Sequence, residues 1–273
     1  MPLKLMYITN RTTVAAIAEN AGVDRIFVDM EYIGKQERQK KQNSVKSAHT
    51  SADVKNIAGV LKKSELLVRV NPVNSASETE IKEVIDCGAD RIMLPMYKSM
   101  AEVEQFLKLT DSKVKTTLLA ETVPAMEIIE QTAKISEVDE IHIGLNDLHL
   151  ALGKRFMFEL LADGTVETLA KKIKSAGKPF GFGGIARIGY GMLPAEYIIK
   201  EHYRLGSSSA ILSRCFGDVY KMDDLNEVSE LFEREIKKIR RTEREAALMT
   251  PQQAQSNRLE VIKRVNKLVG DMA

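Results

Sequence analysis

The sequence has little of what marks several common classes of protein. Its two cysteines, Cys87 and Cys215, have no partner-like spacing in a chain of 273 residues, so they predict buried free thiols in a reducing cytosol rather than a disulfide framework. The N-terminus has no apolar run of the signal-peptide kind, and no stretch approaches the ~18 uninterrupted apolar residues of a membrane span. We therefore expect a soluble, cytoplasmic protein with no membrane partner.

A strong charge of either sign is absent as well. The 40 basic residues nearly balance the 38 acidic ones, and a formal net charge of +2 gives no reason to expect nucleic acid as a partner. The chain contains no GxxxxGK(S/T) phosphate loop, no GxGxxG turn after a first strand and no zinc-ligand spacing. Kinase, nuclease and dehydrogenase functions are therefore without support.

What the sequence does contain is a regular alternation of short apolar runs and amphipathic segments. The apolar runs predict eight strands, at 3–9, 25–31, 65–71, 91–96, 118–121, 141–147, 179–185 and 208–216. The segments between them predict helices at 13–22, 51–64, 77–88, 99–110, 123–135, 158–177 and 193–206. Strands that are apolar throughout are typical of a parallel sheet covered by helices. Eight such units predict an α/β fold, a closed (β/α)8 or TIM barrel, which needs ~250 residues.

Beyond the barrel, the end of the chain is helical and highly charged. We divide the chain into a barrel, residues 1–222, and a C-terminal helical extension, residues 223–273, whose second helix runs from Pro251 to Gly270. The apolar residues of that helix recur at helical spacing and need a surface to cover: Leu259, Ile262, Val265 and Leu268. This surface is either the chain's own barrel, which the extension would complete, or a neighbouring subunit, and we expect a homo-oligomer.

Two carboxylates stand at the centre of the predicted barrel. Glu121 and Asp147 follow successive strands, joined by a crossover helix, so both fall at the C-terminal edge of the sheet and side by side. Two carboxylates that converge need a positive charge between them, and a hard divalent cation such as Mg²⁺ is the usual solution. The alternative is that Glu121 caps its helix and Asp147 forms an Asx turn before Leu148.

Other polar residues follow the remaining strands and would face the same mouth, where barrel active sites lie. They are Asp29 and Glu31, Arg69 and Asn71, Asn146, and on the late strands and loops Arg187 and Ser213. We expect Arg69 to grip a carboxylate or an enolate oxygen, or else to form a salt bridge with Glu31. Asp29 and Glu31 would orient Arg69 and the waters around a metal. This ring suits an anionic substrate held on a metal.

Two irregular segments would reach this mouth. The segment 34–49 carries the basic residues Lys35, Arg38, Lys40, Lys41 and Lys46 and ends in His49, so it is either a solvated loop or a lid over the site. The glycine-rich segment 181–191 follows the seventh strand, where barrels often bind phosphate. Arg187 within it would suit a phosphate or a second carboxylate, and the alternative is a tight turn that needs positive φ.

Five of these segments together resemble one known family. The segments VDMEYIG, LLVRVNP, GADRIMLPM, LLAETVPAMEIIEQ and DEIHIGLNDLHLALG, between about residue 25 and 153, are similar to the HpcH/HpaI aldolase and citrate lyase beta-subunit family. The resemblance implies a barrel that binds Mg²⁺ or Mn²⁺ through Glu121 and Asp147, with Arg69 on the carboxylate and enolate of a 2-oxo acid. It also implies a carbon–carbon lyase or aldolase acting on pyruvate or oxaloacetate, assembled as a trimer or hexamer. We expect Asn71, Gly144, Asn146 and Arg187 to contact the substrate.

One departure from the family concerns the general base. Aldolase members carry a histidine directly after the glutamate of the second strand, whereas this chain has Tyr32 after Glu31. Tyrosine is a poor base near neutral pH because its pKa is ~10. Either a water on the metal or His49 takes the proton, with His142 and His149 as weaker candidates, or the reaction differs. The alternatives are a citrate-lyase-like enzyme for an acyl-CoA thioester and a non-catalytic barrel that only binds the metal.

Overall fold

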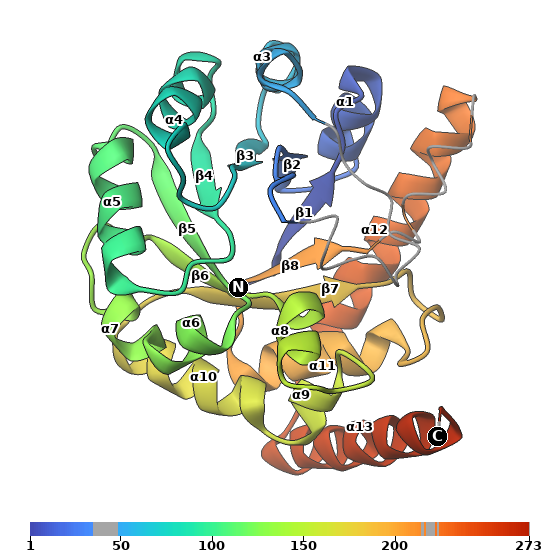
Figure 1. Ribbon diagram of the computed structural model, residues 1–273. Helices are drawn as coiled ribbons and strands as arrows, with labels where there is room; N and C mark the ends of the chain where they lie inside the picture. Colours follow the sequence, from blue (N-terminus) through green and yellow to red (C-terminus); the bar gives the residue numbers. More distant parts are fainter. Residues whose placement is uncertain (35–48, 214–215, 217–221, 223, 273) are drawn as a thin grey trace.

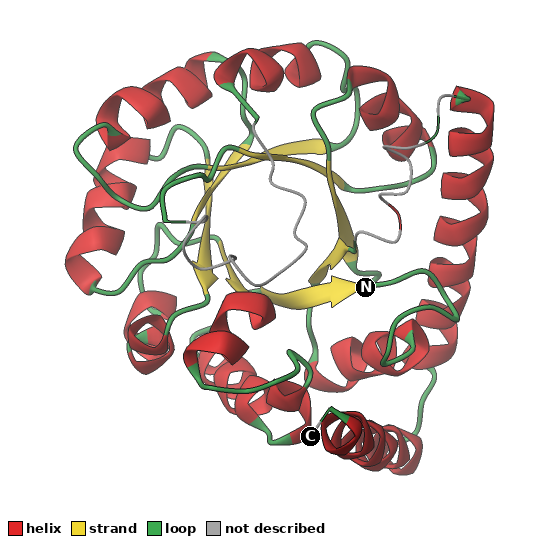
Figure 2. Cartoon of the chain, turned by 45° about the vertical axis from the view of Figure 1, so that its right-hand side comes forward, coloured by secondary structure: helices red, strands yellow, loops and turns green. Residues whose placement is uncertain are grey.

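The computed structural model describes residues 1–34, 49–213, 216, 222 and 224–272. Its eight strands are all parallel and close into one barrel in sequence order (Figures 1 and 2). They are β1 (Lys4–Ile8), β2 (Arg25–Asp29), β3 (Glu65–Arg69), β4 (Arg91–Leu94), β5 (Lys115–Ala120), β6 (Glu140–Ile143), β7 (Phe180–Ile185) and β8 (Ser209–Leu212). The predicted (β/α)8 barrel is confirmed.

Helices surround this barrel on the outside, as Figure 2 shows in the view along its axis. They are α1 (Thr12–Asn20), α3 (Ser51–Ala58), α4 (Ser77–Asp86), α5 (Met100–Thr110), α6 (Val123–Glu127), α7 (Ile129–Ala133), α8 (Leu145–Ala151), α9 (Glu159–Ala162), α10 (Thr165–Ser175), α11 (Ala195–Leu205), α12 (Leu225–Ala247) and α13 (Pro251–Asp271). No helix within the described ranges is long and apolar enough to cross a membrane.

Residue alternation along each strand creates two separate cores. One side of the strands packs against the helices in a large apolar core, which includes Val28 and Val68. The other side fills the barrel with a small apolar cluster of Met6, Phe27, Leu67, Met93 and Leu119, flanked by Ile8 and Ile211. Because side chains alternate with a period of two, the inward positions of β2 are Arg25, Phe27 and Asp29. The barrel interior is therefore apolar at mid-height and charged at both mouths.

The C-terminal extension packs on its own barrel. Helix α12 lies against α1 and α11 and so completes the ring of helices, and Glu243 on it accepts a hydrogen bond from the Leu3 backbone N–H at 2.6 Å. Helix α13 lies against α9 and α11, with Val261 and Val265 fully buried. One member of the predicted apolar set, Leu259, remains 57 % exposed. Packing on the chain's own barrel thus explains most of the predicted apolar residues of this helix.

Several helix boundaries differ from those expected. The predicted helix 123–135 is two short helices that meet at Ile128, and the predicted helix 158–177 is interrupted at Gly164, whose φ of +86° is outside the helical region. Helix α13 continues through Gly270 to Asp271. The chain here keeps helical φ and ψ, so this glycine does not act as a stop.

The two cysteines are predicted to be buried free thiols. Cys87 is a free thiol but only partly buried. Cys215 and most of the loop 34–49, including its lysines and Arg38, lie outside the described residues.

Candidate active site

The ends of β2 and β3 place one arginine between two carboxylates. Arg69 Nε and Nη2 donate to the two oxygens of Asp29, each at 2.9 Å, and Nη2 also lies 3.3 Å from Glu31 Oε2. Asp29 and Arg69 are paired in the strand register, so the sheet itself sets this contact. The guanidinium also lies 5.6 Å from the centroid of the inward-facing Phe27 ring. The expected salt bridge with Glu31 is confirmed, and Asp29 orients Arg69.

Electrostatics keep this arginine charged. Burial alone would lower the pKa of Arg69, but the negative charges of Asp29 and Glu31 outweigh it and raise the pKa. Glu121, from the opposite part of the mouth, contributes to the same upward shift. Arg69 therefore provides a permanent positive charge that faces three carboxylates at one end of the barrel.

Glu121 is held at the end of β5 by the next strand and the preceding loop. Ala120 pairs with Ile143 in the sheet register, so Glu121 lies opposite Gly144. A Cβ on Gly144 would come within 2.7 Å of the Glu121 Cβ and 2.9 Å of its Oε2, so only glycine leaves room for this carboxylate. Glu121 is only 3 % exposed. Its carboxylate therefore occupies one defined place at the mouth.

The loop after β4 contributes a residue that the sequence did not point to. The Met96 N–H donates to Glu121 Oε1 at 3.2 Å, and Met96 has a left-handed φ of 55°. Such a φ is strained for a bulky side chain and is found where the surroundings enforce it, often at functional sites. The sequence offers no signal for this residue, because its role is carried by the backbone N–H.

The capping alternatives for the two central carboxylates are wrong. Thr122, and not Glu121, caps α6: its hydroxyl accepts from the Ala125 N–H at 3.1 Å. Asp147 lies in the first turn of α8 rather than in a turn before Leu148, and a carboxylate in that position is favoured by the helix dipole. Asn146 precedes it in the same turn and is partly buried.

Asn71 supports the loop after β2. Its Oδ1 accepts from the backbone N–H groups of Tyr32 and Ile33, both at 3.0 Å, and its Nδ2 donates to Glu80 at 2.8 Å. The side chain is 3 % exposed. The structure thus gives Asn71 a role in holding the backbone around Glu31, while its predicted contact with substrate stays a prediction.

The two candidate bases after β2 differ in their surroundings. Tyr32 is 69 % exposed, so its side chain extends into solvent. His49 Nδ1 accepts a hydrogen bond from the Asp29 N–H at 3.0 Å. The neutral ring then carries its proton on Nε2, and it can take a second proton only by giving up that hydrogen bond. In this geometry His49 acts as an anchor for the end of β2.

The two weaker histidine candidates are packed inside the protein. His142 is fully buried, with Nε2 3.3 Å from the Gly183 carbonyl, and burial lowers its pKa to about 4. His149 is 5 % exposed, and its Nδ1–H donates to the Leu145 carbonyl one turn earlier at 3.1 Å. Both contacts are those of core residues.

The glycine-rich segment 181–191 begins inside β7 and continues after Ile185 as a turn at the same end of the barrel. Gly183, Gly189 and Gly191 all have positive φ, which explains the glycines by backbone conformation. The Arg187 guanidinium stacks on the Tyr190 ring, 4.3 Å from its centroid. The positive φ values agree with the tight-turn alternative. Binding of an anion by Arg187 stays a prediction. Ser213, after β8, donates its backbone N–H to the Ile185 carbonyl at 2.8 Å.

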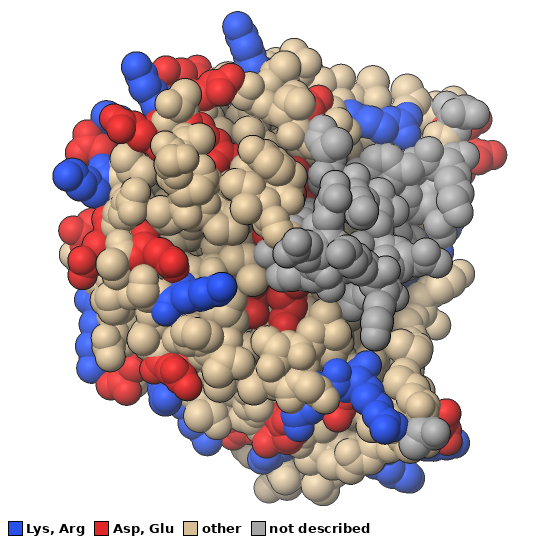
Figure 3. All heavy atoms as spheres, viewed as in Figure 1, with Lys and Arg blue, Asp and Glu red and all other residues tan. Residues whose placement is uncertain are grey.

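These residues fit a magnesium or manganese ion. Among the described residues there is no group of three or more His, Cys, Asp or Glu side chains able to hold a metal. The predicted donors are two carboxylates, Glu121 at the end of β5 and Asp147 in the first turn of α8. Carboxylate oxygens suit hard cations, and Mg²⁺ is usually bound by one or two carboxylates with waters and substrate oxygens in the other positions. Figure 3 shows acidic side chains at the centre of the face that carries α6 and α8.

Comparisons with known proteins agree with this arrangement. The family model described as HpcH/HpaI aldolase/citrate lyase matches residues 4–185. The solved structure of an HpcH/HpaI aldolase from Desulfitobacterium hafniense DCB-2 is 16 % identical, covers 84 % of this chain and 93 % of its own, and has a TM-score of 0.62. A family member from Burkholderia cenocepacia J2315 is 18 % identical, with 83 % and 94 % covered and a TM-score of 0.61.

The citrate synthase SbnG is also similar in structure, with 17 % identity, 85 % of this chain and 93 % of its own covered, and a TM-score of 0.60. The comparison with curated proteins gives no significant match. At these identities the structural likeness shows the fold alone, whereas the family model covers two thirds of the chain, including Arg69, Glu121 and Asp147. The chain belongs to the HpcH/HpaI aldolase/citrate lyase family.

Proposed function

We propose that this protein is a divalent-metal-dependent carbon–carbon lyase that forms or uses the enolate of a 2-oxo acid such as pyruvate or oxaloacetate. The observation that supports the proposal is that Arg69 and Glu121 lie together at the C-terminal mouth of the barrel, where Asp147 follows in the first turn of α8. Glu121 raises the pKa of Arg69 together with Asp29 and Glu31, so the arginine and one of the two predicted metal ligands lie close together. Family membership supports lyase chemistry.

Arg69 is oriented for a substrate oxyanion. Its Nε and Nη2 are occupied by Asp29 and Glu31, whereas Nη1 has no hydrogen-bond partner among the described residues. In this proposal Nη1 donates to the carboxylate or keto oxygen of the substrate, where negative charge develops during enolate formation. A preorganised donor of this kind stabilises the transition state more than the ground state.

Glu121 and Asp147 would hold the cation, and Mg²⁺ or Mn²⁺ when bound supplies a Lewis acid for the oxygens of a 2-oxo acid. The Met96 N–H and the space at Gly144 fix the Glu121 carboxylate before substrate arrives. The inward ring of Phe27 closes the floor of the mouth below Arg69. Such an apolar floor excludes water from one side and strengthens the electrostatic interactions above it.

A second candidate is a barrel that binds metal and anion without catalysis. The exposed Tyr32 favours it, because the position that carries a histidine in aldolase members here points a weakly basic side chain to solvent. In the lyase proposal the proton passes instead to a water molecule at the mouth, since His49 is bound through Nδ1 to the β2 backbone.

Enolate formation can be measured without knowledge of the full substrate. We would incubate the protein with pyruvate and Mg²⁺ or Mn²⁺ in D₂O and follow loss of the methyl-proton signal by NMR. We expect metal-dependent exchange that falls by a factor on the order of 100 or more in Glu121→Gln and in Arg69→Gln, the usual cost of losing a transition-state contact. Glu130→Gln is the matched control, since Glu130 is a 51 % exposed glutamate paired with Lys134 on α7.

Each outcome separates the two candidates. Exchange that is lost in both site variants and kept in Glu130→Gln supports the lyase proposal. Exchange at equal rates in all variants would place the reaction elsewhere. No exchange by a protein that binds Mn²⁺ would contradict pyruvate enolisation and favour the binding barrel, or a donor of another class such as an acyl-CoA thioester.

A further inference from the structure

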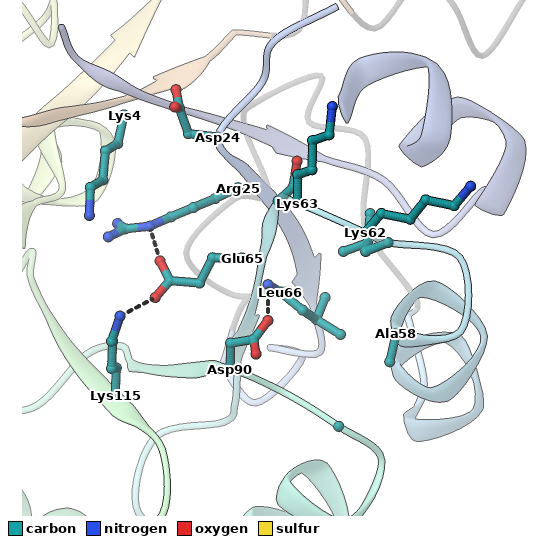
Figure 4. Close-up of a pocket in the computed structure, with 13 residues that line it drawn as sticks. Lys4, Asp24, Arg25, Ala58, Lys62, Lys63, Glu65, Leu66, Asp90 and Lys115 are labelled. Carbon is teal, nitrogen blue, oxygen red and sulfur yellow. Dashed lines mark hydrogen bonds and ion pairs between the residues drawn. The ribbon is translucent and has the colours of Figure 1, made fainter. Parts of the chain in front are cut away.

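The opposite end of the barrel holds a second charged cavity. Its volume is about 660 Å³, which is within the range of sites for small molecules, and it lies where the strands begin. Five basic and three acidic side chains line it: Lys4, Arg25, Lys62, Lys63 and Lys115, with Asp24, Glu65 and Asp90. In Figure 4, Lys4 and Lys115 reach toward the Arg25–Glu65 pair, whereas Lys62 and Lys63 extend away from it.

The first residues of the strands build this mouth. Lys4, Arg25, Glu65, Arg91, Lys115 and Glu140 open β1 to β6 in order. The first four lie two positions before a residue of the inner apolar cluster, and Lys115 lies four positions before one. Glu140 lies two positions before His142, which is buried inside the barrel. Because strand side chains alternate, all six point into the barrel. Four cations and two carboxylates therefore converge at this end.

The two carboxylates are already engaged by the arginines. Arg25 Nη1 and Nη2 donate to the two oxygens of Glu140 at 2.9 and 2.8 Å, and Arg25 Nε donates to Glu65. Arg91 Nε and Lys115 Nζ lie 3.2 and 3.5 Å from Glu65 Oε1. Burial alone would raise the pKa of Glu65, but the charges of Arg25 and Arg91 lower it to about 2. Both carboxylates are thus fully ionised and still outnumbered.

The acids at the rim are occupied by other groups. Asp24 Oδ2 accepts from the Leu5 N–H at 2.8 Å and from Arg240 Nη2 at 2.7 Å, and Asp90 accepts from the Leu66 N–H at 2.7 Å. No carboxylate in the described part of the chain lies within 4.0 Å of the Lys4 ammonium. The positive charge of Lys4 and part of that of Lys115 therefore remain unbalanced at the cavity.

We propose that this N-terminal mouth is a binding site for a small anion with two or more negative charges, a phosphate ester or a polycarboxylate. The anion sits between the Lys4 and Lys115 ammonium groups, above the guanidinium of Arg25. The two arginines and two carboxylates of the floor balance one another, so the net positive charge of the site comes from Lys4 and Lys115. This site is separated from the candidate active site by the apolar layer of Met6, Phe27, Leu67, Met93 and Leu119.

Calorimetric titration of the full chain in metal-free buffer tests the site. The probes are pyrophosphate and propane-1,2,3-tricarboxylate, which separate a preference for phosphate from one for carboxylate. We expect one anion per chain, with a dissociation constant that rises about 5- to 10-fold in Lys4→Gln and in Lys115→Gln. Both lysines are exposed, so these variants keep the fold. Lys134→Gln, which removes a 65 % exposed lysine that follows α7, is the control and leaves binding unchanged.

Three results would overturn the proposal. The first is no heat of binding for either probe at concentrations up to ~10 mM, which is ~10 times the dissociation constant of a weak, millimolar complex. The second is equal affinity in the wild type, Lys4→Gln and Lys115→Gln. The third is loss of binding in Arg69→Gln with retention in both lysine variants, because the anion would then lie at the other mouth.

Discussion

At the scale of single residues, the candidate site depends on side chains that hold other side chains. Both carboxylate oxygens of Asp29 accept hydrogen bonds from Arg69, and the backbone N–H of Asp29 donates to His49 Nδ1. Arg69 would otherwise have several rotamers, and fixing them in advance lowers the cost of binding an anion. The function of Asp29 is therefore to present the remaining edge of the guanidinium to the mouth.

The variant Asp29→Asn tests this role. The amide would keep the shape of the carboxylate but accept only one of the two guanidinium hydrogen bonds, so Arg69 loses its fixed orientation. We expect pyruvate exchange to fall ~10- to 100-fold, as for residues that orient reacting groups, while Mn²⁺ affinity changes less than ~3-fold. NMR exchange and calorimetry measure the two effects. Asp111→Asn, at a 69 % exposed aspartate, is the control. An unchanged exchange rate would show that Asp29 is dispensable.

Gly144 gives a second prediction at this scale. Alanine there would place a Cβ 2.7 Å from the Cβ of Glu121 and 2.9 Å from its Oε2, so the carboxylate has to move. We expect Gly144→Ala to weaken Mn²⁺ binding by at least ~10-fold, a typical cost of disturbing a metal ligand. Gly270→Ala is the control, because a Cβ at Gly270 meets nothing within 4 Å. Equal metal affinity in both variants would mean that Glu121 does not bind the ion.

At the scale of elements, two neutral histidines are buried on the two sides of the barrel wall: His142 on β6 points into the barrel, and His202 on α11 lies between the barrel and the helices. His202 stacks on Phe182 with ring centroids 3.7 Å apart, and its Nδ1 lies 2.8 Å from the Ser207 hydroxyl. Burial lowers the pKa of His142 to about 4 and that of His202 to about 3, and the neighbouring His142 adds to the shift of His202. Both side chains are therefore neutral in the folded protein near neutral pH.

This pair makes stability dependent on pH. In the unfolded chain histidine has a pKa of ~6.5, so the unfolded state binds protons first as the pH falls. The stability that the neutral rings provide is complete above pH ~6.5 and is lost as the pH decreases toward about 4. Each histidine contributes up to ~1.4 kcal/mol per pH unit in this window.

We expect the free energy of unfolding to decrease from about pH 7 to about pH 5, with a smaller decrease in His202→Gln, which removes one of the two buried groups. Urea titrations across this range, with the slope of free energy against pH compared between the two proteins, measure this. Parallel pH profiles would show that His202 binds its proton equally well in the folded and unfolded states.

The elements also show what the sequence can and cannot predict. All eight strands are found because a run such as RIFVD, which is buried throughout, is unambiguous. The predicted strand 141–147 is shorter than expected: β6 ends at Ile143, and Leu145 to Asp147 form the first turn of α8. The helix over 123–135 was predicted as one piece, since apolar spacing continues across Ile128, where the backbone leaves the helical region. Cap residues are harder to predict: Thr122, and not Glu121, caps α6. These choices depend on hydrogen bonds that only the folded chain defines.

For the site, the positions of strand ends were sufficient to group Asp29, Glu31, Arg69 and Glu121. The contribution of Met96 could not be predicted, because a backbone N–H leaves no trace in the residue type. The charged residues at the other mouth were missed for a different reason. Arg25 and Glu65 begin apolar runs, so the sequence places them in buried strands and does not show that the two side chains pair. The available signal was a charge at the first position of three predicted strands, Arg25, Glu65 and Arg91.

At the scale of the whole molecule, the barrel separates two mouths of different charge. The C-terminal mouth gathers carboxylates around Arg69, and the N-terminal mouth gathers basic groups around Glu65 and Glu140. The layer between them is apolar. The metal ion with its 2-oxo acid and the second, multiply charged anion would therefore bind at opposite ends. Substitutions at one mouth do not touch the residues of the other mouth.

The outside of the molecule supports a prediction about assembly. Leu248 and Leu259, in the C-terminal extension, are 83 % and 57 % exposed. We propose a homo-oligomer and expect light scattering to give three or six times the 30.5 kDa of one chain. Leu248→Asp combined with Leu259→Asp would reduce that mass if the extension forms the contact. A wild-type mass of one chain at micromolar concentration would contradict the prediction.

The central claim is that one mouth holds a divalent cation and a 2-oxo acid together, and co-binding tests it most directly. Mn²⁺ is titrated by electron paramagnetic resonance with and without oxalate, a planar mimic of the pyruvate enolate. We predict that oxalate tightens Mn²⁺ binding about 10-fold or more, that Mn²⁺ tightens oxalate binding by the same factor, and that Arg69→Gln removes most of this coupling. Mn²⁺ binding that is absent, or that oxalate leaves unchanged, would contradict the account.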